Sequence, residues 1–460
     1  MRRQSIGARA RTGLMAAAVA GSLVVGGCAT ARPEKALTAT TEDGHLVPLD
    51  SVTISYDVGG LHVIQRPSFG NDVVSVHLYL LGGTRQLTPG TQGIEPLLLG
   101  ASEYGTANYP GAAARSSWAR TGSQLLISPD DDWTLFGFRG IRQEFDSSWN
   151  VFADRVMHPT LAEHDIALVR SQMTGAIRQR RSDPDGYVMM VADSIAFPGH
   201  PYSLQVSGTE ASLAALDSAI LARYVASQMV TSRMLLVAVG NLSRARLEAA
   251  LARTLATLPR GDYVWKLPDS LPVTASSVSL IERPIATEYI VGLFQGPPAS
   301  AREYAALRVA TALLSSRMHR AIREERGLSY AASAPYFERG IGTGAIYVTT
   351  SAPNKVMPLI RKQMDELRNL APDAFSIRYF TDQFILDYFA ENMTSTAQAD
   401  FLARAQLYRG DYRQAGKSME ELRDISIGEL RAASRRYFRN VHFVYLGDTT
   451  RVTRSSFDDF

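Results

Sequence analysis

The sequence predicts an α+β fold in which two tandem halves of similar plan each pack helices against an antiparallel-rich sheet. Residues 73–81 alternate apolar and polar side chains, which is typical of a half-buried strand. Four apolar residues farther along recur at intervals of three, four and four, which indicates one face of a helix. They are Ile166, Val169, Met173 and Ile177. Each half then ends in a helix and an apolar strand, at 234–239 and at 442–446. This repeated order indicates an internal duplication.

Length and composition set the expected domain boundaries. A chain of 460 residues with 45% hydrophobic side chains exceeds one typical core. We expect an N-terminal domain over residues 48–265 and a C-terminal domain over residues 266–460, joined by a Pro- and Ser-bearing linker at 258–277. Residues 28–47 show no apolar period, so we expect them to form a flexible tether.

The first 27 residues are typical of a secretory signal peptide. They carry four arginines and no acidic residue, and an apolar run at 14–25 follows. Twelve helical residues span about 18 Å, which is too short for a bilayer core of about 30 Å. The run closes on Val25-Gly26-Gly27-Cys28, which resembles the lipobox of bacterial lipoproteins. We therefore expect a lipid on Cys28. Ala29 stands where the inner-membrane retention signal of such lipoproteins would have Asp, so the resemblance implies sorting to the outer membrane. We expect the protein on the periplasmic side of that membrane.

The charge balance argues against a nucleic-acid partner. The chain has 48 basic and 45 acidic residues, but removal of the four leader arginines leaves 44 basic residues against 45 acidic ones. Arg178, Arg180 and Arg181 lie at an otherwise polar helix end and are interpreted as a solvated face. The single cysteine excludes a disulfide framework within the chain and a cysteine-rich metal site.

Several short motifs resemble the insulinase/pitrilysin family of zinc metallopeptidases, which includes the mitochondrial processing peptidases. The resemblance covers residues 52–448 and follows that family's two-domain order. The matching segments are Gly82-Gly83-Thr84-Arg85, 93–99, Gly105-Thr106, Arg181-Ser182-Asp183-Pro184, 197–202, Ser316-Arg317 and 326–330. The resemblance implies two insulinase-like domains that form part of a peptidase chamber.

The zinc motif of that family is degenerate here. Active members carry His-x-x-Glu-His on a helix, in which two His bind zinc and Glu is the general base. Alignment on Gly93 places Glu95, Leu98 and Leu99 at those positions, and the spacing to the third ligand leads to Ala176. Leucine and alanine cannot coordinate zinc, so the resemblance implies a chain without a metal of its own. We interpret Glu95 as a polar residue at a pocket edge.

A second stretch imitates the zinc motif. Thr160-Leu161-Ala162-Glu163-His164 differs from it by Thr in place of the first His. Thr160 and Glu163 have the spacing of a helix capping box, which is the interpretation we prefer. The remaining histidines form no pair at i and i+4.

The second half retains a pair of residues that binds substrate in the family. Active relatives bring an Arg and a Tyr, seven residues apart, to the peptide carbonyl. The matching residues here are Arg323 and Tyr330. We expect the preceding helix to end near Gly327 and Tyr330 to begin the next strand. A guanidinium and a phenol supply the donors that a developing oxyanion requires.

These observations lead to three hypotheses. The first is a zinc-less subunit of a heteromeric peptidase, which supplies Arg323 and Tyr330 to a zinc-bearing partner that processes peptides or unfolded polypeptides. The second is a non-catalytic polypeptide-binding or assembly scaffold, anchored in the membrane by its lipid. The third is an independent zinc metalloendopeptidase with an unrecognised site. A neighbouring gene that encodes an intact zinc motif would favour the first, and stoichiometric zinc in this chain would favour the third.

Overall fold

A computed structural model describes residues 38–40, 46–48, 52–271, 275–370 and 373–460. The expected signal peptide and Cys28 lie outside the described residues. Within the segment expected to be a tether, β1 (Thr38–Thr40) and β2 (Leu46–Pro48) form an antiparallel pair. Among the described residues, no helix combines the length and the apolarity that a bilayer crossing requires.

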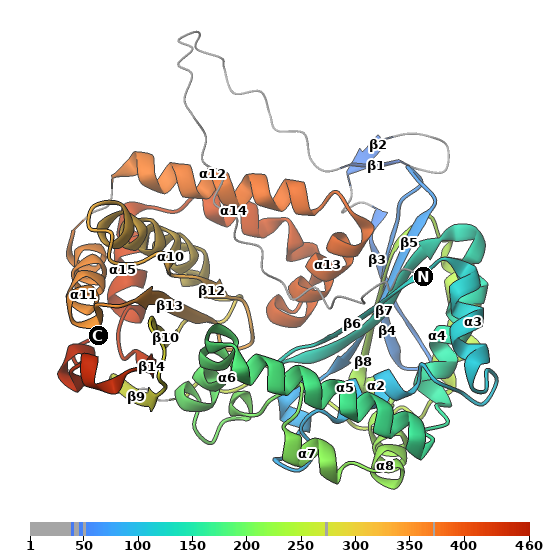
Figure 1. The fold of residues 1–460 in the computed structure, drawn as a ribbon. Helices are drawn as coiled ribbons and strands as arrows, with labels where there is room; N and C mark the ends of the chain where they lie inside the picture. Colours follow the sequence, from blue (N-terminus) through green and yellow to red (C-terminus); the bar gives the residue numbers. More distant parts are fainter. Residues whose placement is uncertain (1–37, 41–45, 49–51, 272–274, 371–372) are drawn as a thin grey trace, which may run out of the picture. The chain divides into compact units, whose positions relative to one another are not determined.

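The first half is built on a six-stranded sheet (Figure 1). Its spatial order is β3-β4-β8-β5-β7-β6, in which only β4 and β8 run parallel. The strands are β3 (Ile54–Val58), β4 (Leu61–Pro67), β5 (Val73–Leu81), β6 (Gln124–Pro129), β7 (Trp133–Ile141) and β8 (Met234–Gly240). The strand β6 therefore forms one edge of this sheet.

The second half repeats the same plan. Its order is β9-β14-β10-β13-β11, β12 also pairs with β13, and β9 with β14 is again the parallel pair. The strands are β9 (Ser277–Glu282), β10 (Glu288–Gln295), β11 (Ala332–Ser333), β12 (Tyr336–Phe337), β13 (Thr343–Thr350) and β14 (His442–Gly447). If β11 and β12 are counted as one strand and the strands of each half are numbered one to five from β4 and from β9, both sheets read 1-5-2-4-3. The α+β fold class is confirmed.

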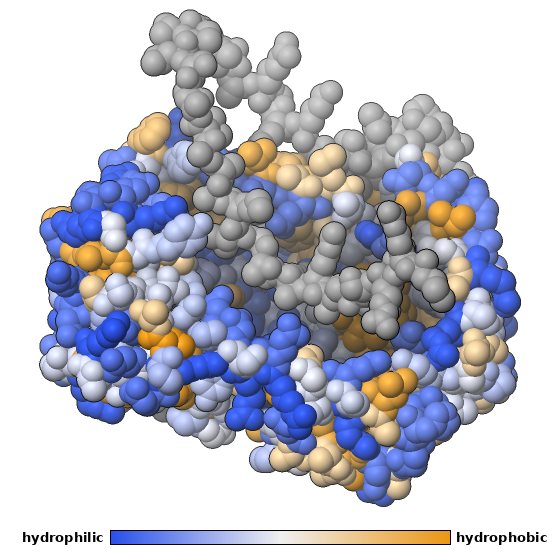
Figure 2. Space-filling model, in the orientation of Figure 1, coloured by the Kyte–Doolittle hydropathy of each residue, from blue (hydrophilic) through white to orange (hydrophobic). Residues whose placement is uncertain are grey.

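Helices surround both sheets. In the first half they are α2 (Ile94–Ala101), α3 (Ala112–Thr121), α4 (Phe145–Met157), α5 (Glu163–Ser182), α6 (Pro184–Ala196), α7 (Glu210–Ala215), α8 (Ser218–Gln228) and α9 (Arg244–Ala252). In the second they are α10 (Glu303–Met318), α11 (Pro353–Asn369), α12 (Ala374–Glu391), α13 (Ser395–Arg409), α14 (Lys417–Arg423) and α15 (Ile427–Tyr437). Hydrophobic residues form small separate patches on the face drawn in Figure 2.

The two halves exchange helices. The second-half helix α13 packs on the first sheet, where Leu402 and Tyr408 share a core with Leu235 and Trp133. In the reciprocal arrangement, the first-half helix α6 packs on strands β10 and β14 of the second sheet. Each sheet is thereby covered on both faces, one by helices of its own half and the other by a helix of the opposite half (Figure 1).

This exchange corrects one sequence interpretation. Strand β5 is buried on both faces after its first residue, although its alternation predicted a half-buried strand. Val76 and Leu78 face the core of the first half, whereas Tyr79 faces α13. His77 is 1% exposed between Ser75 and Tyr79, and its ring nitrogens lie 3.0 Å from Ser75 Oγ and 3.1 Å from the Tyr79 hydroxyl.

The predicted stripe on α5 is confirmed, but the predicted capping box is wrong. Ile166, Val169 and Ile177 are buried. The helix begins only at Glu163, after Ala162, and no side chain caps it. Leu161 adopts a left-handed φ of 52°, which turns the chain and separates Thr160 from the helix end. The Glu163 carboxylate instead accepts a hydrogen bond of 3.0 Å from the Ser218 backbone amide.

Candidate functional site

Helix α2 carries the positions that correspond to the zinc motif. It starts after Gly93, whose φ is 82°, a conformation that favours glycine. A Cβ atom at Gly93 would lie 2.8 Å from the Gly208 Cα, so the close approach also requires glycine. Glu95 follows in the first turn, where a carboxylate interacts favourably with the helix dipole.

Glu95 is the centre of a buried polar cluster, not a residue at a pocket edge as the sequence predicted. Its side chain and that of Arg233 are 4% and 1% exposed, and the Arg233 guanidinium pairs with Glu95 Oε1. The Tyr224 hydroxyl donates a 2.7 Å hydrogen bond to the same oxygen, and the Thr134 hydroxyl donates to Oε2. We call Glu95, Thr134, Tyr224 and Arg233 the Glu95 cluster.

Charge is balanced inside this cluster. Burial alone would lower the pKa of the Arg233 guanidinium, but the adjacent Glu95 carboxylate raises that pKa above its usual range. Burial and the same carboxylate raise the pKa of the Tyr224 phenol well above its ordinary value. The cluster therefore holds one cation, one anion and two neutral hydroxyl groups, and both carboxylate oxygens already accept hydrogen bonds.

The four positions do not fit a zinc ion. Zinc takes nitrogen, sulfur or oxygen donors, usually in a tetrahedral arrangement. Leu98 and Leu99 are 1% exposed in the core of the first half, Ala176 is exposed on α5, and Glu95 is paired with Arg233. Throughout the part of the chain that the structure describes, no three His, Cys, Asp or Glu side chains are grouped so as to hold a metal.

Arg323 and Tyr330 lie together in the second half. Arg323 is on a π-helical turn (His319–Glu324) that continues α10, and such turns occur frequently at functional sites. Gly327 has a φ of 60°, and its amide donates to the Arg323 carbonyl at 3.0 Å. This left-handed residue ends the helix, as the sequence predicted. The chain then returns so that the Arg323 Cζ lies 4.7 Å from the centroid of the Tyr330 ring.

Tyr330 precedes a strand instead of beginning one. It lies in a bend, 81% exposed, two residues before β11. Within the described residues, neither the Arg323 guanidinium nor the Tyr330 hydroxyl forms a hydrogen bond or an ion pair. Tyr330 is exposed and Arg323 is half-buried, and both side chains carry donors that a carbonyl or carboxylate oxygen can accept.

The sequence analysis missed the partner of Glu95 and the polar contacts between the halves. Arg233 immediately precedes the apolar strand β8, and a charged residue beside a buried strand indicates a buried partner. Between the halves, Asp132 is 1% exposed and accepts hydrogen bonds from Tyr202, Tyr408 and the Gly340 amide at 2.7–2.9 Å. Three consecutive aspartates, Asp130–Asp132, were the available signal.

Comparisons with known proteins agree with the fold. Residues 216–378 match the family described as the peptidase M16 inactive domain. The chain is 22% identical to an uncharacterized zinc protease of Rickettsia bellii over 306 residues, 65% of this chain and 73% of that protein. It is also 22% identical to the uncharacterized zinc protease YmxG of Bacillus subtilis over 170 residues, 37% of this chain and 42% of that protein.

Solved structures establish the same fold. A peptidase M16 inactive domain from Pseudomonas fluorescens superposes with a TM-score of 0.78 at 18% identity, over 86% of this chain and 98% of that one. A chain of complex III2 from Candida albicans superposes with a TM-score of 0.74 at 16% identity, over 87% of this chain and 98% of that one. The resemblance that the motifs predicted is thus confirmed: the chain is a homologue of the insulinase/pitrilysin (M16) zinc peptidases and carries a match to their inactive domain.

Proposed function

We propose that this chain is the zinc-less subunit of a heteromeric peptidase and supplies Arg323 and Tyr330 to a zinc-bearing partner at the cell envelope. The observation that carries the proposal is the contrast between two sites. The Glu95 cluster occupies the place of a metal site and is neutralised internally. Arg323 and Tyr330 lie in contact and unpaired within the described residues.

The pair has the chemistry to assist peptide hydrolysis. When a partner's zinc-bound water attacks a peptide carbonyl, negative charge develops on the carbonyl oxygen. In our proposal the Arg323 guanidinium, whose Cζ lies 4.7 Å from the centroid of the Tyr330 ring, and the Tyr330 hydroxyl donate hydrogen bonds to that oxygen. Loss of one such donor typically costs a factor of about 10² to 10³ in kcat.

Strand β6 supports the binding of an extended peptide. It is the terminal strand of the first sheet, and its outer edge has no strand partner within the described residues. Its six residues give it a longer edge than the two-residue strands β11 and β12 at the corresponding position of the second half. An extended polypeptide can add to such an edge through main-chain hydrogen bonds.

The heteromer in our proposal also has indirect support. The family comparison identifies an inactive domain, and one structural neighbour is a chain of a multi-subunit complex. The test is to mix this protein with a zinc-bearing relative from the same organism and to measure peptide cleavage. We expect cleavage only with both chains, and we expect Arg323→Ala to reduce kcat/KM of the mixture at least 100-fold.

A matched control is available in the same half. Arg302 is 88% exposed and pairs with Glu429, so Arg302→Ala should leave cleavage unchanged. If the zinc-bearing relative alone is fully active, or if Arg323→Ala and Arg302→Ala behave alike, the proposal fails. The free edge of β6 would then favour the second candidate, a polypeptide-binding scaffold, which cross-linking in cells would reveal through partners that lack a zinc motif.

The cellular location belongs to the same proposal. We infer that the protein is held at the outer membrane by a lipid on Cys28. Each buried CH₂ of the acyl chains contributes about 0.8 kcal/mol to membrane anchoring. Labelling with a radioactive fatty acid followed by membrane fractionation checks this. Cys28→Ser should lose both the label and the membrane association, and an unlabelled wild-type protein would contradict the anchor.

A further inference from the structure

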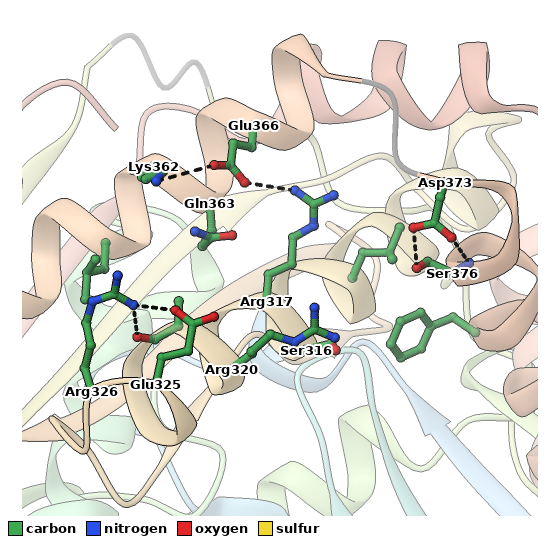
Figure 3. A pocket seen from close by; sticks show the side chains of 14 residues that line it. Ser316, Arg317, Arg320, Glu325, Arg326, Lys362, Gln363, Glu366, Asp373 and Ser376 are labelled. Atoms are coloured by element: carbon green, nitrogen blue, oxygen red, sulfur yellow. Dashed lines mark hydrogen bonds and ion pairs between the residues drawn. The ribbon is translucent and has the colours of Figure 1, made fainter.

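A pocket in the second half lies outside the sites described above. It has a volume of about 380 Å³ and lies between α10, the π-helical turn, α11 and α12 (Figure 3). This volume is within the range of small-molecule sites. The turn that forms part of its wall is the one that carries Arg323.

The acidic side chains of the pocket are already engaged. Glu366 pairs with Arg317 at 3.2 Å and with Lys362 at 3.9 Å, as Figure 3 shows. Glu325 pairs with Arg326 at 2.7 Å. Asp373 accepts two hydrogen bonds of 2.7 Å from Ser376 at the start of α12. Glu325 and Glu366 are therefore paired with three of the four basic groups that line the pocket, and Asp373 is held by Ser376.

The fourth basic group, Arg320, is an exposed side chain that has no polar partner in the part of the chain that the structure describes. Its guanidinium forms no hydrogen bond or ion pair within the described residues, and Figure 3 draws no interaction to it. The side chains of Ser316 and Gln363, which also line the pocket, have no hydrogen-bond partner among the described residues either. Gln363 is 9% exposed, so its amide has few possible hydrogen-bond partners other than groups in the pocket.

The rest of the lining is apolar. Leu313, Ala321, Leu359 and Phe380 contribute hydrocarbon surface. A ligand that fits all of these groups carries an anionic end for Arg320 and an apolar side chain for this surface. The net charge of the lining is one positive charge, which suits a monoanion. The planar guanidinium group can donate two hydrogen bonds to a carboxylate in a bidentate geometry. A dianionic phosphate carries one charge more than the lining balances, so the three nearby carboxylates would repel it more strongly.

We propose that this pocket binds a carboxylate that lies next to an apolar side chain, as at the carboxyl terminus of a peptide. Arg320 is the residue that pairs with this carboxylate. The inference does not depend on a partner subunit. The probes are N-acetyl-leucine, its uncharged amide, acetate and inorganic phosphate, each titrated into the purified protein with detection by ligand-observed NMR. We expect N-acetyl-leucine to saturate with a Kd on the order of 1 mM.

The comparison among probes and variants decides the proposal. The amide, acetate and phosphate should each bind at least tenfold more weakly. The amide lacks the negative charge, acetate lacks the apolar side chain, and phosphate does not carry a single negative charge. Arg320→Gln should weaken N-acetyl-leucine at least tenfold, and Arg302→Gln, which changes an exposed arginine outside the pocket, should not. Circular dichroism verifies that both variants fold. The proposal is overturned if N-acetyl-leucine and its amide bind equally, or if phosphate binds as tightly as N-acetyl-leucine. It is also overturned if N-acetyl-leucine does not saturate, or if Arg320→Gln binds it as tightly as the wild type does.

Discussion

The two halves share a strand order but use their charged residues in opposite ways. In the first half, the Glu95–Arg233 ion pair is almost entirely buried, and two hydroxyl groups donate to the same carboxylate. In the second half, Tyr330 is 81% exposed and the half-buried Arg323 lies over its ring, and neither side chain forms a hydrogen bond or an ion pair within the described residues. Groups that saturate one another are unavailable to a ligand, whereas unpaired donors at a surface can bind one.

Because of this difference, mutations in the two halves should change different properties of the protein. Burial of an ion pair costs a large desolvation energy, and the attraction between the two charges offsets that cost only when both partners are present. Its loss should therefore appear as a change in folding free energy. An exposed cation–π pair contributes only about 0.5–1 kcal/mol, so its loss should appear in binding or catalysis and hardly in stability.

The largest expected effect is on the Glu95 cluster. Arg233→Met should lower the free energy of unfolding by about 3–5 kcal/mol, because it leaves the Glu95 carboxylate buried without its cation. Urea denaturation measures this. The double variant Glu95→Gln/Arg233→Met should regain part of the loss, since the glutamine keeps an acceptor for Tyr224 and carries no charge.

An exposed ion pair of the same half is the matched control. Arg244 and Glu248 pair at 2.7 Å with 53% and 36% of their side chains exposed. Arg244 also lies over the Tyr56 ring, with its Cζ 4.3 Å from the ring centroid, so Arg244→Met should change the free energy of unfolding by less than about 1.5 kcal/mol. If Arg233→Met costs no more than Arg244→Met, the Glu95 cluster is not the stabilising unit described above.

The next effect concerns His77, where the first sheet meets α13. Burial lowers the pKa of His77 to about 4, although Asp400 opposes that shift. Between pH 6.5 and 4 the unfolded chain therefore binds a proton that the folded chain does not, and stability falls as the pH falls. The loss approaches about 3 kcal/mol at pH 4.

A variant separates this contribution from the titration of the carboxylates. Denaturation of the wild type and of His77→Gln at pH 7 and pH 4 gives two pH dependences. The wild type should lose more stability than the variant over that interval. Equal losses would mean that His77 is protonated in the folded state, and the buried polar row of Ser75, His77 and Tyr79 would then need another explanation.

The sequence predicted the fold class and the loss of zinc ligands because both depend on local information. Side-chain period distinguishes strands from helices, and Leu99 and Ala176 at two ligand positions exclude coordination there whatever the tertiary structure. The partner of Glu95 was not predictable in the same way, since Arg233 is 138 residues away and only the pairing of strands brings it close. A rule of local spacing also failed at Thr160, where the left-handed Leu161 delays the helix.

The exchange of α6 and α13 explains the other differences. Alternation on β5 predicted one exposed face because sequence periodicity cannot show that a helix from the other half covers it. The same long-range packing buries His77 and Asp132, which are polar residues that composition alone places at a surface. Arg323 and Tyr330 were identified through the family resemblance, whereas the contact between them and the position of Tyr330 before β11 were not predicted.

The smallest effect is expected from the Tyr330 hydroxyl. Tyr330→Phe keeps the ring that contacts the Arg323 guanidinium but removes one of the two donors proposed for the substrate carbonyl. In the two-chain peptidase, kcat/KM should fall about 100-fold, the lower end of the range for one such donor. This is less than the effect expected of Arg323→Ala, which also removes the positive charge. The free energy of unfolding should change by less than about 0.5 kcal/mol because the side chain is exposed. Peptide-cleavage kinetics and urea denaturation of the same preparations measure both quantities. A loss of stability without a loss of activity would make Tyr330 a packing residue and would remove the functional contrast between the two halves.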